Sequence, residues 1–74
     1  MYTITYKSRF RKIDTGSEII YRIEDCDTAF EVFKEKIKWN VEHITQVNAD
    51  SEFTLTSPNG MLLKKVTIKT EVTI

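Results

Sequence analysis

The sequence predicts a two-layer α+β sandwich, in which an antiparallel sheet of four to five strands carries one helix on one face. Apolar and polar residues alternate on both sides of the middle of the chain, as in strands with one buried face. Only residues 27–40 have the apolar spacing of an amphipathic helix. The segment between the first two predicted strands is too short for a crossover, which indicates a hairpin. The expected order is therefore strand, strand, helix and then two or three strands.

The first two strands are predicted from strict alternation. Residues 2–10 place aromatic residues and isoleucine on one face, and threonine, lysine and arginine on the other. Residues 14–17 have the composition of a turn, in which Gly16 can adopt a positive φ. Residues 19–24 alternate again and complete the hairpin.

The helix is predicted to begin at Asp27 or Thr28, either of which can cap it, and Thr28 and Glu31 have the spacing of a capping box. We expect it to end near Asn40, because asparagine tolerates the left-handed conformation of a helix C-cap. An alternative end lies near Ile44, since apolar residues up to that position continue the helical stripe. The shorter helix is preferred because several β-branched residues follow Asn40 and favour a strand.

The C-terminal half is predicted to hold two or three strands. Residues 43–49 form one of them, and Asn48, Asp50 and Ser51 loosen the chain into a turn or bulge. Residues 53–56 alternate, and residues 57–60, with the sequence Ser-Pro-Asn-Gly, form the clearest turn in the chain. The run 61–74 is a long final strand.

One face of this sheet and one side of the helix are expected to form a common core. The predicted inward-facing residues are Ile4, Tyr6, Phe10, Tyr21, Ile23, Phe30, Phe33, Ile37, Val47, Phe53, Leu55, Val66 and Ile68.

Length and composition indicate a single domain, residues 1–74, with no membrane span. The 11 basic and 11 acidic side chains balance, which argues against both a dedicated nucleic-acid binder and a mimic of DNA. A single cysteine fits a reducing compartment, and the first residues contain no apolar run of signal-peptide length. We therefore expect a cytoplasmic location.

The residue types needed for catalysis or for metal binding are scarce. The chain has one histidine, His43, and one cysteine, Cys26, and their spacing from other groups suggests neither a nucleophile with its base nor a zinc site. The acidic residues 24–27 lack the glycine and the distant glutamate of a calcium loop. Gly16 and Gly60 are too far apart to form a phosphate-binding loop. The sequence thus predicts a protein that is not an enzyme and has no metal or cofactor.

Protein binding is the favoured function, and the helix carries the main signal for it. Val32 and Trp39 fall off the predicted core side of the helix, with Lys36 between them. Tryptophan is enriched at binding hot spots, so these three residues are the predicted protein-binding surface. Ile20 and Leu63, on the face of the sheet without the helix, add to this signal. The alternative is that Trp39 folds over the helix end onto the core.

Two further functions stay open. The face of the sheet without the helix is mildly basic and could contact nucleic-acid phosphates, although it lacks aromatic residues for base stacking. The residues of this possible site are Lys7, Arg9, Arg11, Arg22, Lys65 and Lys69. The other possibility is a homodimer in which the terminal strand, as an open edge, pairs with its copy.

The general build, a hairpin, one helix and another hairpin with no catalytic set, resembles that of small accessory proteins of phages and mobile elements. The resemblance covers the architecture alone. It implies a protein that binds a host enzyme or defence complex and inhibits or modulates it.

Overall fold

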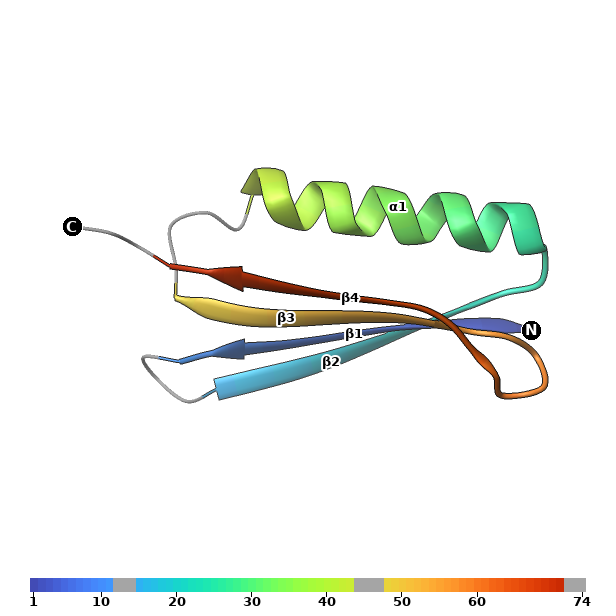
Figure 1. Cartoon of the computed structure of the whole chain (residues 1–74), viewed down its shortest axis with the longest axis horizontal. Helices are drawn as coiled ribbons and strands as arrows, with labels where there is room; N and C mark the ends of the chain where they lie inside the picture. Colours follow the sequence, from blue (N-terminus) through green and yellow to red (C-terminus); the bar gives the residue numbers. More distant parts are fainter. Residues whose placement is uncertain (12–14, 44–47, 72–74) are drawn as a thin grey trace.

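A four-stranded antiparallel sheet carries one helix on one face (Figure 1). The structure is a computed structural model that describes residues 1–11, 15–43 and 48–71. Across the sheet the strands have the order β2-β1-β3-β4. The predicted α+β class and the ββαββ order of elements along the chain are both confirmed. The elements are β1 (Tyr2–Phe10), β2 (Thr15–Ile23), α1 (Cys26–His43), β3 (Ala49–Thr56) and β4 (Leu62–Thr70).

Strand β1 lies in the middle of the sheet and pairs on both sides. Its register with β2 runs from Tyr2 opposite Ile23 to Phe10 opposite Thr15, and on its other side Phe10 lies opposite Ala49 of β3. The order of the four strands leaves β2 and β4 at the two edges of the sheet. No helix in the described ranges is both long enough and apolar enough to cross a membrane.

The core lies between α1 and the central strands. Ile4, Phe53 and Leu55 point from the sheet toward Ala29 and Phe33 of the helix, and all five are buried. This confirms the central part of the predicted inward set, whereas Ala29 and Ala49 are buried residues that it omitted. Eight of the remaining predicted residues are partly buried, and the last, Val47, lies outside the described residues. The eight are Tyr6, Phe10, Tyr21, Ile23, Phe30, Ile37, Val66 and Ile68.

The predicted turn at residues 14–17 was wrong for its last three residues. Thr15, Gly16 and Ser17 belong to β2, and Asp14 lies outside the described residues. Gly16 does not have a positive φ. Its small size matters for another reason, because a Cβ atom at this position would lie 3.0 Å from the backbone oxygen of Ser8. Close approach of the two strands, rather than turn geometry, therefore explains this glycine.

The predicted start of the helix and its preferred end near Asn40 were wrong, whereas the alternative end near Ile44 agrees with a helix that runs to His43. The N-terminal cap is Asp25, whose Oδ2 accepts hydrogen bonds from the backbone N–H of Thr28 at 2.9 Å and from its Oγ1 at 2.8 Å. The helix continues past Asn40 to His43. Asn40 is buried inside the helix and bonds to the sheet, so contact with the sheet outweighs the preference of the β-branched Val41 for a strand.

Replacing Asp25 with alanine should lower the melting temperature by a few degrees, because the first turn of α1 loses its cap. The two bonds from Thr28 also lower the pKa of the Asp25 carboxyl. A carboxylate whose pKa is lowered by folding stabilises the folded protein at pH values above the pKa that it has in the unfolded chain. This stabilisation is lost as the pH falls through the pKa that it has in the folded protein. Asp25→Asn is the matched control, since asparagine also caps a helix but does not titrate. Thermal melts from neutral pH to about pH 2 test this; equal melting temperatures for all three proteins at neutral pH would contradict it.

The third strand begins later than the sequence predicted. His43 is helical, residues 44–47 lie outside the described residues, and β3 runs from Ala49 through the predicted turn or bulge to Thr56. Every second residue of β3 is buried, and the residues between them are partly exposed. The buried residues are Ala49, Ser51, Phe53 and Leu55. The turn at residues 57–60 is confirmed: the N–H of Gly60 donates to the oxygen of Ser57, and Gly60 has a φ of 87°.

Candidate protein-binding groove

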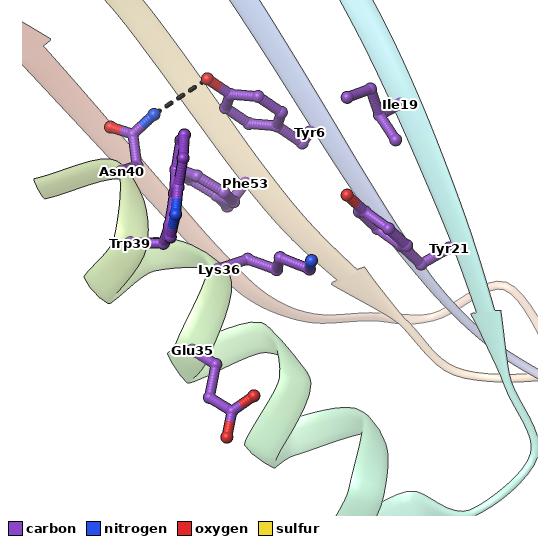
Figure 2. A pocket seen from close by; sticks show the side chains of 8 residues that line it. All are labelled: Tyr6, Ile19, Tyr21, Glu35, Lys36, Trp39, Asn40 and Phe53. Carbon is purple, nitrogen blue, oxygen red and sulfur yellow. Dashed lines mark hydrogen bonds between the residues drawn. The ribbon is translucent and has the colours of Figure 1, made fainter. Parts of the chain in front are cut away.

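A groove of about 400 Å³ lies between the second half of α1 and the sheet, on the side of β2 (Figure 2). It exists because the buried core contacts of the helix are with β1 and β3. The helix-side residues of the first part of β2, which are Thr15, Ser17 and Ile19, therefore remain exposed. The residues that line it are Tyr6, Ile19, Tyr21, Glu35, Lys36, Trp39, Asn40 and Phe53.

The floor of the groove is aromatic. The rings of Tyr6 and Phe53 stack with centroids 4.6 Å apart, and Phe53 meets the ring of Phe33 edge-on at 6.4 Å. Tyr21 and Ile19 extend the floor along β2 toward the edge of the sheet (Figure 2). A floor whose rings are held by the core is a preformed apolar surface, as binding pockets generally are.

Lys36 and Trp39 form the helical wall. Lys36 extends from α1 toward the strands, and its Nζ lies 4.8 Å from the centroid of the Tyr21 ring (Figure 2). The ring of Trp39 stacks on that of His43, with centroids 4.6 Å apart and an interplanar angle of 14°. The Nδ1 of His43 lies 2.9 Å from the backbone oxygen of Trp39, which holds the imidazole in place. Trp39 is thereby oriented although 55% of its surface is exposed.

Asn40 joins the end of the helix to the sheet at one end of the groove. Its Nδ2 donates to the hydroxyl of Tyr6 at 2.8 Å, and the Oγ of Ser51 lies 3.5 Å from the same nitrogen. Asn40 is only 1% exposed, and its Oδ1 has no hydrogen-bond partner among the described residues. Because Tyr6 accepts the bond from Asn40, its own hydroxyl hydrogen can still be donated. The groove thus combines an apolar floor with a polar end.

The structure separates the three residues predicted to bind protein. Lys36 and Trp39 line the groove, whereas Val32 is partly buried and packs against the core. The expected second stripe opposite the core was therefore wrong: these residues flank the core on the β2 side. Trp39 lines the groove and stays half exposed, so it is not folded onto the core in the way the alternative required.

Sequence reasoning missed the strand residues of this site. The sequence pattern places Tyr6, Tyr21 and Phe53 in the core and gives no functional signal for Ile19. Their common signal was their position on one face of alternating strands. That signal does not reveal where the helix crosses the sheet, and so it does not predict which core residues border a groove.

The face of the sheet without the helix carries basic residues that have acidic neighbours. The carboxylate of Glu18 lies 3.8 Å from Lys7, and that of Glu52 lies 3.9 Å from Lys65. The guanidinium group of Arg11 donates hydrogen bonds to the Asp50 carboxylate at 2.5 Å and to the backbone oxygen of Thr70 at 2.8 Å. The ammonium group of Lys69 lies 3.3 Å from the Glu71 carboxylate. These contacts reduce the positive charge that a phosphate would meet. Nucleic-acid binding by this face, with Arg9 and Arg22, stays a prediction.

Cys26, the first residue of α1, is exposed. A hydrogen bond between its side chain and that of Tyr2 raises the pKa of Tyr2, and the charges of Cys26, Asp25 and Asp27 act in the same direction. Within residues 1–11, 15–43 and 48–71, no three histidine, cysteine, aspartate or glutamate side chains are placed to hold a metal ion.

Comparison of the chain with protein-family models, with curated proteins and with solved structures found no match. Its function is therefore inferred from the geometry of the groove.

Proposed function

We propose that this chain is a small non-enzymatic protein-binding module whose partner docks in the groove between α1 and β2. The observation that carries the proposal is the position of Trp39, a half-exposed tryptophan at the wall of an aromatic groove. Aromatic anchors in preformed pockets dominate the energy of protein interfaces. An exposed tryptophan held by a stacked histidine also loses little side-chain freedom on binding.

The lining of the groove suggests the chemistry of the partner segment. The floor accepts a large apolar side chain, and a volume of about 400 Å³ is within the range of binding sites for small ligands. Lys36 reaches over this floor, while Glu35 points away from the strands (Figure 2). The ammonium group of Lys36 favours an acidic residue beside the apolar anchor. The proposed partner is thus a protein segment with an apolar side chain next to an aspartate or glutamate.

A module of this kind acts by covering a surface of its target. We extend the proposal to inhibition or modulation of a larger enzyme or defence complex, which the resemblance to phage and mobile-element accessory proteins implies. A cytoplasmic location stays a prediction.

The fluorescence of Trp39 tests this proposal, because the chain has no other tryptophan. A partner purified from the native host by affinity to the chain is titrated into it. Docking in the groove should shift the Trp39 emission to shorter wavelength as water leaves the indole. Saturable binding without any change in this emission would show that the partner binds elsewhere.

A further inference from the structure

In the sheet that the described residues form, strand β2 lies at an edge and has exposed apolar side chains on both of its faces. It is an edge strand of nine residues, and its first six residues are all exposed. Ile19, on the helix side, is 43% exposed, and Ile20, on the other side, is 45% exposed. Edge strands offer unpaired backbone N–H and C=O groups to another strand, and proteins usually protect them with charges, proline or a covering element. The centre of β2 has the sequence Glu-Ile-Ile-Tyr-Arg, in which three large apolar or aromatic residues lie between one acidic and one basic residue.

The charges of β2 are complementary to those of a second copy in one register. When a strand pairs antiparallel with its own copy around a twofold axis, residues at equal distances from the axis lie opposite each other. With Ile20 on the axis, Glu18 lies opposite Arg22 of the second copy, and Arg22 lies opposite Glu18 of the second copy. Opposite charges directly across a strand pair stabilise it, whereas like charges destabilise it.

Neighbouring registers lose this match. An axis at Glu18 or at Arg22 places identical charges opposite each other. An axis at Ile19 or at Tyr21 places a charged residue opposite Ile20 of the second copy. Only the register centred on Ile20 pairs both charges and also brings the two Ile20 side chains together. We propose that β2 pairs with β2 of a second copy of this chain in that register, forming a continuous eight-stranded sheet, which is twice the four strands described.

The same register continues the side-chain rows that already cross the sheet. On the face without the helix, Glu52, Lys7 and Glu18 lie opposite one another on adjacent strands, so Arg22 of the second copy extends an alternation of charge. On the helix side, Phe53, Tyr6 and Ile19 form a row that Tyr21 of the second copy extends. Each partner therefore adds a tyrosine to the floor of the other's groove, and the two grooves meet across the seam.

The other edge of the sheet lacks this complementarity. Between its ends β4 carries Lys64, Lys65 and Lys69 and no acidic residue, so no register confined to the residues of β4 pairs opposite charges, and Glu71 beyond it already lies 3.3 Å from Lys69. This favours β2 over the terminal strand that the sequence suggested for a homodimer. A seam of one strand pair is small beside the roughly 1,200–2,000 Å² of a standard interface. We therefore expect a reversible dimer whose population rises with concentration.

Charge reversal tests the register. Glu18→Arg alone places two arginines opposite each other at both ends of the seam, and Arg22→Glu alone places two glutamates there. Each single variant should raise the dimer dissociation constant by about tenfold or more. An equimolar mixture of the two variants should form the dimer again, because each supplies the charge that the other lacks. The double variant Glu18→Arg/Arg22→Glu should also recover it.

Sedimentation equilibrium from about 10 μM to about 1 mM measures these constants, and circular dichroism checks the fold of each variant. Ile20→Lys, at an exposed position on the axis, is a second variant that should weaken the dimer. Slower amide exchange in β2 at high concentration of the unaltered chain is a readout that needs no substitution.

A monomeric unaltered chain over the whole range would overturn the proposal. A dimer that all three single variants leave unchanged would overturn it too, and would place the seam elsewhere. The β2 pairing does not depend on the groove having a partner, so its failure leaves the proposed function standing.

Discussion

Replacing Phe53 with alanine is expected to destabilise the chain by about 3–5 kcal/mol, the usual cost of deleting a buried aromatic ring. Phe53 is 1% exposed and contacts both layers, because its ring stacks on Tyr6 and meets Phe33 edge-on. A chain of this length has a total stability of about 4–11 kcal/mol. The substitution thus removes a large share of the stability, and a substantial part of the protein should be unfolded at 37 °C.

Urea unfolding followed by circular dichroism measures this loss. Phe30→Ala is the matched control, since Phe30 is a phenylalanine that is only partly buried at the margin of the core. It should cost clearly less. Equal losses for the two variants would mean that the stack of Tyr6, Phe53 and Phe33 is not the centre of the core.

Replacing Trp39 with alanine is expected to weaken binding of the protein partner about 30-fold, the loss that corresponds to a hot-spot residue. The same change should leave the stability almost unaltered, because the indole is half exposed and its ring partner, His43, is also exposed. Isothermal titration calorimetry gives the affinity, and urea unfolding gives the stability.

Val41→Ala is the control for this experiment. Val41 is 54% exposed on the same helix, close to the value for Trp39, but it does not line the groove. Its substitution should change the affinity by less than about threefold. Similar losses for both variants would indicate that the partner recognises the helix as a whole, and would contradict a site in the groove.

The sequence predicted the layers and the order of the elements along the chain well, because both follow from local patterns. Alternation in β1 and the Ser-Pro-Asn-Gly turn define their elements without any tertiary contact. The errors occur where tertiary contacts outweigh local preference. Asn40 has the local character of a helix terminus, but its bond to Tyr6 buries it within the helix. Asp50 and Ser51 look like turn residues, but they belong to β3, in which Ser51 is buried.

The candidate site was predictable only in part, for a related reason. Trp39 and Lys36 stood out because they do not fit the core stripe of one helix. Tyr6, Tyr21 and Phe53 fit the core pattern of their strands, and they line a groove only because α1 leaves part of β2 uncovered. Which part of a sheet a helix covers depends on packing between distant segments. Local periodicity does not contain that information.

The groove as a preformed and open site is tested most directly by the accessibility of Trp39 in the free chain. Quenching of its fluorescence by acrylamide, a neutral solute, reports this accessibility without any partner. We predict efficient quenching in the free chain, and protection from quenching once a partner is bound. A Trp39 that is already protected in the free monomer, with an emission typical of a buried indole, would contradict the proposed site.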